Sequence, residues 1–243
     1  RILVYGHRGA GFLAPENTMA SFKLAQAIGV DTIELDVHLT SDGNLAVIHD
    51  HDVSRTTTGR GVIGEMTLAE VRQLDAGAKF SQAYAGERMP HLPEVLDWAR
   101  DRIPLLIEIK ATPEPAPGMA AAVVKAVREV GMADQVLVKS FFHASVKKVR
   151  EMAPEIATGI LLASAPLSPV AIAQSAGADS LRNLWSYWTE EAVWAARKVG
   201  LHTSAWGVND ERALARVIAL GLDSFGTDRP KWALETLMKQ GLC

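Results

Sequence analysis

Eight short apolar segments alternate with helical patterns along this chain, and this alternation limits the fold more than any other feature of the sequence. The predicted strands begin near residues 2, 32, 105, 136, 158, 179, 202 and 223. Strands that alternate strictly with helices form parallel sheets, and eight of them favour a closed (β/α)8 TIM barrel. A doubly wound open sheet is the alternative, but no Gly-x-Gly-x-x-Gly pattern follows the first strand. Asn17 is expected to cap the first helix.

The alternation is interrupted once, after the second strand. Residues 45–48 form a further short apolar run, and the stretch at about 50–92 then keeps no simple period, apart from one predicted helix at 68–74. Long irregular segments inside a compact domain usually cover a functional site. We therefore expect a single TIM-barrel domain over residues 1–243, with an insertion at about 50–92 over the active end. A chain of 243 residues, 48% of them hydrophobic, is long enough for such a core.

The strand predicted at 32–38 has an unusual pattern. Ile33, Leu35 and Val37 alternate with Glu34 and Asp36, so that one face is aliphatic and the other is acidic. Two carboxylates side by side repel each other unless a cation or a proton lies between them. A solvated strand face is the simpler interpretation. We favour a cation site, because both faces of a barrel strand are buried.

More polar side chains follow the predicted strands, at the end of the barrel where catalytic groups of this fold class lie. Glu108 and Lys110 end the third strand of the barrel and share a face, because they are two residues apart. Glu34, Asp36 and Glu108 on adjacent strands suit a hard cation with oxygen ligands, Mg²⁺ or Ca²⁺. A structural ion pair between Glu108 and Lys110 is the alternative.

Histidines follow two of the apolar runs. His7 stands between Gly6 and Arg8, followed by Gly9; the glycines let the backbone approach a ligand, and the guanidinium suits phosphate. His49 follows the run at 45–48 in the same way. Two histidines near one metal ion can serve as acid and base around neutral pH. The other histidines are interpreted as surface or core-edge residues: His38, His51, His91, His143 and His202. Of these, His38 and His51 are candidates to support the site.

Charge and composition exclude several classes of protein. A net charge of −3 gives no basic surface for nucleic acid, and no apolar run has the length of an integral membrane segment. The only cysteine is Cys243, so neither an intramolecular disulfide nor a cysteine metal site is expected. We expect a cytoplasmic protein, although a signal peptide removed by processing would leave the same sequence. The oligomeric state is open.

Several motifs together resemble the glycerophosphodiester phosphodiesterase family. They extend from the first predicted strand to the last and are HRG at 7–9, APENT at 14–18, IELDV at 33–37, TSDGNLAVIHD at 40–50, RTTTG at 55–59, EIK at 108–110 and DSFGTDRP at 223–230. The resemblance implies a TIM barrel with an insertion after the second strand. It also implies an enzyme that hydrolyses glycerophosphodiesters, small-molecule substrates, to glycerol 3-phosphate and an alcohol.

The resemblance further implies roles for particular residues. Glu34, Asp36 and Glu108 would hold one divalent cation, Mg²⁺ or Ca²⁺. His7 and His49 would be the acid–base pair, and Arg8 and Lys110 would contact the phosphate. The cation and these two basic residues would stabilise charge on the non-bridging oxygens, while one histidine activates the nucleophile and the other protonates the leaving alkoxide. Which histidine is the base is open, with His7 favoured, and so is the choice between water and a neighbouring substrate hydroxyl as nucleophile.

The alcohol side of the pocket is less defined. Phe141 and Trp206 end predicted strands and are expected to contact the substrate. The family usually has Trp-Thr-Val-Asn where this chain has Trp206, Gly207, Val208 and Asn209. Gly207 is therefore expected to enlarge the alcohol side of the pocket or to loosen its wall. Three aromatic residues within 180–188 would line an apolar pocket or pack a helix end, and we favour packing.

Three other functions are considered. A lysophospholipase D-like enzyme acting on lysophospholipids would need an apolar groove beside the site, and residues 50–92 offer few aliphatic side chains for one. A non-catalytic phosphoester-binding barrel would be expected to lack a histidine or a carboxylate of the site. A metal-dependent sugar-phosphate lyase or isomerase would need a Schiff-base lysine, and Glu108 would keep the one candidate, Lys110, charged.

Overall fold

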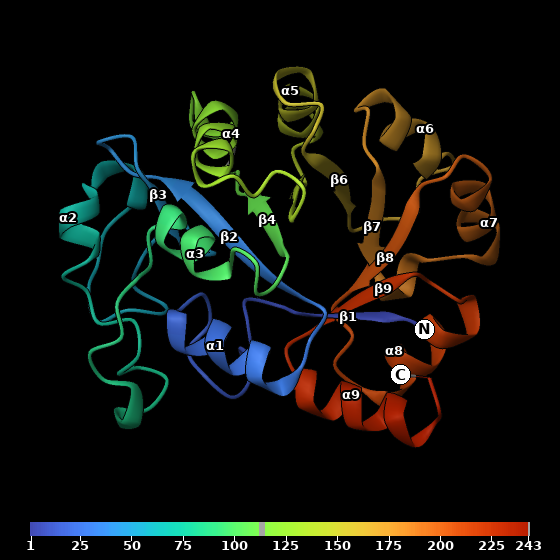
Figure 1. Ribbon diagram of the computed structural model, residues 1–243, viewed down its shortest axis with the longest axis horizontal. Coiled ribbons are helices and arrows are strands. Elements are labelled where there is room, and N and C mark those ends of the chain that lie inside the picture. Colours follow the sequence, from blue (N-terminus) through green and yellow to red (C-terminus); the bar gives the residue numbers. More distant parts are fainter. Residues whose placement is uncertain (112–114, 243) are drawn as a thin grey trace.

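The computed structural model, which describes residues 1–111 and 115–242, contains eight parallel strands that surround the centre of the molecule (Figure 1). They are β1 (Leu3–Gly6), β2 (Thr32–Leu39), β4 (Leu105–Ile109), β5 (Val136–Ser140), β6 (Ala157–Leu162), β7 (Ser180–Leu184), β8 (His202–Trp206) and β9 (Ser224–Thr227). The hydrogen-bonded order is β1-β9-β8-β7-β6-β5-β4-β2, and β2 also pairs with β1. This last pairing closes the ring, and the predicted TIM barrel is confirmed.

Helices form the outer layer of the barrel (Figure 1). They are α1 (Met19–Ile28), α3 (Leu92–Ala99), α4 (Met119–Val130), α5 (His143–Met152), α6 (Pro169–Ser175), α7 (Glu190–Lys198), α8 (Glu211–Leu220) and α9 (Pro230–Lys239). Their apolar faces, with Phe22, Leu96 and Val123 as examples, pack on the strands in one large hydrophobic core. Within the described residues, no helix has both the length and the hydropathy needed to cross a bilayer. Cys243 lies outside the described residues.

The apolar run at 45–48 forms β3 (Leu45–Val47), which lies outside the ring and pairs antiparallel with β2. Between β3 and α3 the chain forms η1 (Ile63–Glu65), α2 (Leu68–Val71) and η2 (Gln82–Tyr84). The α2 helix is shorter than the helix predicted at 68–74, because Gln73 and Leu74 continue it only as i→i+3 turns. Buried apolar side chains of this segment form a small hydrophobic cluster of its own, separate from the main core.

The prediction that Asn17 caps α1 is wrong by one residue. Thr18 is the N-cap: its backbone is extended, and its side-chain oxygen accepts a hydrogen bond from the backbone N–H of Ser21. Asn17 instead has a positive φ of 56°. Its side-chain amide donates to Asp36 Oδ2 at 2.9 Å, and its Oδ1 accepts from the Asp36 backbone N–H at 3.3 Å. Adjacent Asn and Thr are both good caps, and the bond to Asp36 decides between them.

Tyr5 fills the barrel interior next to Gly226, and this contact gives a stability prediction. A Cβ at Gly226 would lie 2.1 Å from Tyr5 Cε2, and the Tyr5 ring is 2% exposed, with its hydroxyl donating to the Ala205 oxygen at 3.1 Å. Because the buried ring would have to shift away from its hydrogen bond with Ala205, Gly226→Ala is expected to lower the free energy of unfolding by about 1–3 kcal/mol. Urea unfolding measures this.

The control for that substitution is Gly64→Ala. An added Cβ at Gly64 meets nothing within 4 Å. This substitution is expected to change the free energy of unfolding by less than about 0.5 kcal/mol. Equal stabilities of the two variants would show that the close approach at Gly226 does not limit side-chain size.

Candidate active site

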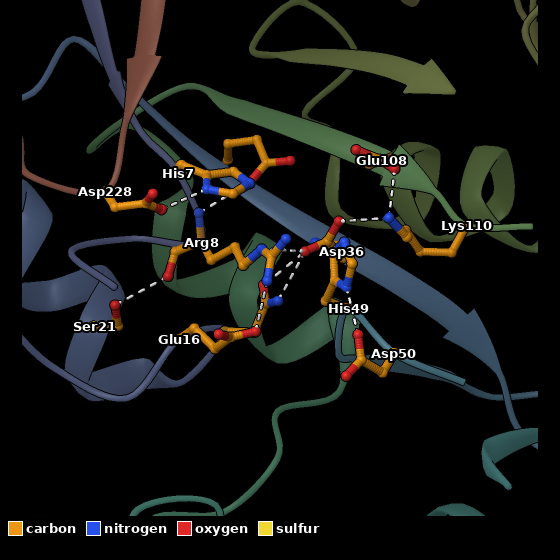
Figure 2. A network of polar contacts seen from close by, with 12 residues as sticks. His7, Arg8, Glu16, Ser21, Asp36, His49, Asp50, Glu108, Lys110 and Asp228 are labelled. Carbon is orange, nitrogen blue, oxygen red and sulfur yellow. Dashed lines mark hydrogen bonds and ion pairs between the residues drawn. The ribbon is translucent and has the colours of Figure 1, made fainter. Parts of the chain in front are cut away.

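The register of the strands brings the three predicted carboxylates together. Asp36 on β2 is paired with Glu108 on β4, and Glu34 precedes Asp36 by two residues on the same face. One carboxylate oxygen from each of the three lies within 4.8 Å of the others, and all three residues are buried. Figure 2 shows Asp36 and Glu108 facing the same region, with Lys110 between them. We call Glu34, Asp36 and Glu108 the carboxylate trio.

The loop after β1 reaches the trio through a tight turn. Arg8 has a positive φ of 56°, and its backbone N–H donates to Glu34 Oε2 at 2.9 Å, while its backbone oxygen accepts from Ser21 Oγ at 3.0 Å. The turn needs both flanking glycines. A Cβ at Gly6 would lie 2.2 Å from the Gly9 oxygen, and a Cβ at Gly9, which has φ +90°, would lie 2.4 Å from Ser21 Oγ. The motif HRG thus places His7 and Arg8 at the trio.

His7 is oriented by an aspartate from the far end of the chain. Its Nδ1 lies 2.6 Å from Asp228 Oδ1, and because a carboxylate only accepts, Nδ1 carries the proton and Nε2 is directed to the trio, 4.0 Å from Glu34 Oε2. Burial lowers the pKa of His7, but Glu34 and the bond to Asp228 outweigh burial and raise it above its ordinary value. Asn209 Nδ2 donates to the other oxygen of Asp228 at 2.6 Å and fixes it.

His49 has the same arrangement at the other side of Asp36 (Figure 2). Its Nδ1 donates to Asp50 Oδ1 at 2.6 Å, and Arg55 Nε donates to Asp50 Oδ2. His38 Nε2 donates to the His49 backbone oxygen at 2.9 Å. Of the two histidines considered as supports for the site, His38 is therefore the one in contact with a predicted catalytic residue. His51 is exposed. Both predicted catalytic histidines therefore have Nδ1 bound to an aspartate.

The Asp50 carboxylate gives a prediction for stability against pH. Burial raises the pKa of Asp50, but hydrogen bonds from Arg55 and His49 outweigh it and lower the pKa to about 2. In the unfolded chain its pKa is about 3.9. The ionised carboxylate therefore stabilises the fold above about pH 4, and this contribution is lost as the pH falls towards 2. Wild type is expected to exceed Asp50→Asn in stability at pH 6, with the difference shrinking below pH 4.

Urea unfolding between about pH 6 and pH 2.5 measures that difference. Asp97→Asn, on the exposed side of α3, is the control for the loss of a surface carboxylate. A difference between wild type and Asp50→Asn that stays constant over the whole pH range would contradict the assignment of the effect to Asp50.

Two cations reach the trio from the ends of β1 and β4. Arg8 Nε lies 3.4 Å from Asp36 Oδ2, and Arg8 Nη1 donates to Glu16 Oε1 at 2.9 Å. Lys110 Nζ donates to Glu108 Oε1 at 2.7 Å and lies 3.6 Å from Asp36 Oδ1. Burial raises the pKa of Asp36, but Lys110 and Arg8 outweigh it and hold the pKa well below its usual range. The ion pair between Glu108 and Lys110 is thus present, and Glu108 also belongs to the carboxylate trio.

The donor set of the trio fits a divalent cation. Glu34 Oε1 and Asp36 Oδ1 accept no hydrogen bond from the described residues. Glu34 Oε1 is in ion-pair contact with Lys139 Nζ at 2.8 Å, and Asp36 Oδ1 with Lys110 Nζ at 3.6 Å. A buried oxygen that lacks a donor costs about 1–3 kcal/mol. Carboxylate oxygens are the ligands that Mg²⁺ and Ca²⁺ prefer, and an ion here would satisfy both.

Several residues that contact the site were missed in the sequence, including Glu16, which accepts a hydrogen bond from Arg8. Asp50 and Asp228 lie in the recognised motifs, but nothing in the motifs shows which histidine each one meets. Asn17 was assigned to a helix cap. Lys139 is the last residue but one of the apolar strand β5 and points inward, and the alternation of that strand was the signal that could have revealed it.

The two aromatic residues predicted to contact substrate lie at the ends of β5 and β8. Phe141 and Trp206 pack edge to face, with ring centroids 5.8 Å apart, and Phe141 is 46% exposed. Trp206 Nε1 donates to the Leu162 oxygen at 3.0 Å. No contact joins this pair to the trio among the described side chains. Within 180–188, Trp188 is buried and donates to the Ser204 oxygen, as the packing interpretation expects, whereas Tyr187 is 42% exposed and lines a pocket.

Comparison with known proteins gives consistent matches over nearly the whole chain. A sequence model described as the glycerophosphoryl diester phosphodiesterase family matches residues 7–232. A glycerophosphodiester phosphodiesterase of Caldanaerobacter subterraneus is 39% identical over 242 residues, which cover 99% of this chain and 100% of the relative.

Solved structures agree with this result. A phosphodiesterase of Oleispira antarctica, in complex with the product sn-glycerol-3-phosphate, superposes with a TM-score of 0.88 and 30% identity, over 97% of this chain and 96% of the other. A putative glycerophosphoryl diester phosphodiesterase of Silicibacter pomeroyi gives a TM-score of 0.88 and 29% identity, over 99% and 94% of the two chains.

Proposed function

Because this chain belongs to the glycerophosphoryl diester phosphodiesterase family, we propose that it hydrolyses glycerophosphodiesters to glycerol 3-phosphate and an alcohol at a carboxylate-bound divalent cation. As a member, it is a phosphoric diester hydrolase. The observation that carries the proposed reaction is the pair of imidazoles around the trio, each with its Nδ1 bound to an aspartate. Support for the product comes from the Oleispira antarctica relative, which is described with sn-glycerol-3-phosphate bound.

Glu34, Asp36 and Glu108 are the residues that would hold the cation, since each has an oxygen in one buried group. When bound, a divalent cation supplies positive charge that stabilises the non-bridging phosphate oxygens in the transition state. Arg8 and Lys110 add to this charge from the open end of the barrel. Their side chains are 16% and 13% exposed, so both are largely desolvated, which strengthens their attraction to an anionic substrate.

His7 is proposed as the general base and His49 as the general acid. In each, the aspartate at Nδ1 fixes the tautomer and leaves Nε2 for proton transfer. His7 Nε2 takes a proton from the nucleophile, which then attacks phosphorus. His49 Nε2 gives a proton to the alkoxide as its bond to phosphorus breaks. Either water or a neighbouring hydroxyl of the glycerol can be the nucleophile in this scheme. Attack by the hydroxyl would form a cyclic phosphate, which water would then open.

Exposed apolar side chains near the site support a second candidate substrate, a lysophospholipid. Phe12, Leu13 and Phe80 are 63%, 41% and 44% exposed, and the Tyr84 hydroxyl joins two of these segments by donating to the Leu13 oxygen at 3.2 Å. Phe80 and Glu16 line one pocket, and Glu16 is bound to Arg8. Phe80 next to the site supports a lysophospholipid as the second candidate, whereas Arg55 and Lys79 in the same pocket and the few aliphatic residues of 50–92 favour glycerophosphodiesters.

Product analysis tests the proposal. Purified protein with MgCl2 or CaCl2 is expected to convert glycerophosphocholine to equal amounts of glycerol 3-phosphate and choline. Faster turnover of lysophosphatidylcholine would favour the second candidate. Binding of both substrates without turnover of either would favour a non-catalytic phosphoester-binding barrel and contradict the proposed activity.

A further inference from the structure

Lys139 is a buried cation next to the carboxylate trio that the proposed mechanism does not use. It lies on β5, paired with Glu108 in the sheet register, and is 2% exposed. Its Nζ is 2.8 Å from Glu34 Oε1 and 3.5 Å from Glu108 Oε2. Two of the three carboxylates therefore share one ammonium group that has no access to solvent.

The second lysine at the trio has more freedom. Lys110 contacts the other oxygen of Glu108, Oε1, and follows β4 at the open end of the barrel. Lys139, in contrast, extends from within the barrel wall, and its Nζ lies 6.0 Å from the centre of the buried Tyr5 ring. Lys110 can turn towards a substrate or away from a bound ion. Lys139 remains beside the carboxylates whatever else binds.

We propose that Lys139 is a positioning residue that acts as a permanent counter-cation of the trio. It holds Glu34 and Glu108 in place when no metal ion is bound, and it lowers the affinity of the trio for a divalent cation. This inference rests on the cation site of the proposed function. It adds that Lys139 sets the affinity of the site for the cation and stabilises the protein when the ion is absent.

Charge balance explains both effects. Three ionised carboxylates repel one another strongly in a buried site, and the ammonium offsets part of that repulsion while the ion is absent. A divalent cation that binds the same carboxylates is repelled by this ammonium. A neutral side chain at position 139 therefore destabilises the ion-free protein and strengthens cation binding. A lysine needed only to fill space would do neither.

Calorimetric titration of Lys139→Met tests the proposal, because methionine removes the charge and nearly keeps the volume of lysine. With CaCl2, and separately with MgCl2, the variant is expected to bind at least about tenfold more tightly than wild type. In chelator its Tm is expected to be lower, so that saturation with CaCl2 raises Tm by more than in wild type. Lys139→Arg, which keeps the charge, is expected to return the affinity to within about threefold of wild type.

Arg182→Met is the matched control. Arg182 is a second buried cation of the barrel, 3% exposed on β7, and its Nη1 donates to Ser204 Oγ at 3.2 Å. No ion pair joins Arg182 to the trio among the described residues, so its loss is expected to change the Kd for calcium by less than about threefold, well below the effect of Lys139→Met, and to change Tm alike with chelator and with CaCl2. If Arg182→Met tightens binding as much as Lys139→Met does, the effect belongs to any lost positive charge and the proposal is wrong.

Other outcomes also decide the question. Unchanged or weaker calcium binding by Lys139→Met overturns the proposal. Lys139→Gln, which is neutral but polar, is expected to show the same tightening and serves if the methionine variant does not fold. If neither variant folds in saturating CaCl2, the lysine is a requirement of the barrel and the proposal is wrong. If wild type and both variants fold but bind neither ion, the cation site of the proposed function fails, and this inference fails with it.

Discussion

Replacing His7 or His49 by alanine lowers the rate of glycerophosphocholine cleavage by about two to four orders of magnitude, while the fold is retained. The reason is that each imidazole transfers a proton in the transition state. No other described side chain is placed to transfer that proton instead. The two side chains are about 30% exposed, at 29% and 31%, so their removal leaves no large buried cavity. Initial rates at saturating substrate and cation measure the effect, and circular dichroism checks the fold.

His51→Ala is the matched control for these variants. His51 lies two residues from His49, but it is exposed. Its replacement is expected to leave the rate within about twofold of wild type, since surface substitutions away from a site have small effects. Wild-type rates in both His7→Ala and His49→Ala would remove the acid–base assignment, whatever the products are.

Removing the cation, or a carboxylate that holds it, has the second large expected effect. Chelation of wild-type protein with EDTA lowers turnover by at least about a hundredfold, and MgCl2 or CaCl2 restores it. Glu108→Gln keeps the size of the side chain but removes one ionised ligand. This variant is expected to stay at least about a hundredfold slower at cation concentrations that saturate wild type.

Glu65→Gln serves as the control for the loss of a carboxylate, because Glu65 is exposed on η1. It is expected to keep both wild-type turnover and the wild-type response to EDTA. Full activity in chelator, with no metal detected in the protein, would contradict metal dependence. A Glu108→Gln variant as fast as wild type would instead show that this residue belongs only to the ion pair with Lys110.

The barrel was accessible from the sequence because its determinants are local. Each strand is a short apolar run, each helix has its own apolar face, and their alternation leaves few folds to choose from. The antiparallel pairing of β3 outside the ring was less accessible, because the run at 45–48 has the same apolar pattern as a barrel strand. The error at Asn17 has a similar origin, since the preference for capping is local and the competing bond to Asp36 is not.

Within the site, the carboxylates were accessible because alternation puts Glu34 and Asp36 on one face and strand order brings Glu108 beside them. The partner of His7 was not, because Asp228 is 221 residues away and meets it only when β9 closes the ring beside β1. Lys139 does not depend on closure, because it meets Glu108 across the neighbouring β4–β5 pairing and Glu34 one strand further on. The alternation of β5 points its side chain inward, but the two distances to Glu34 and Glu108 that define its role come only from the structure.

The position of the ion is the most direct test of the central claim, that Glu34, Asp36 and Glu108 hold one divalent cation flanked by His7 and His49. Crystals of active protein grown with CaCl2 are expected to show one anomalous peak about 2.3–2.6 Å from an oxygen of each carboxylate. No peak at the trio at saturating calcium, or a peak bound by other residues, would contradict the claim.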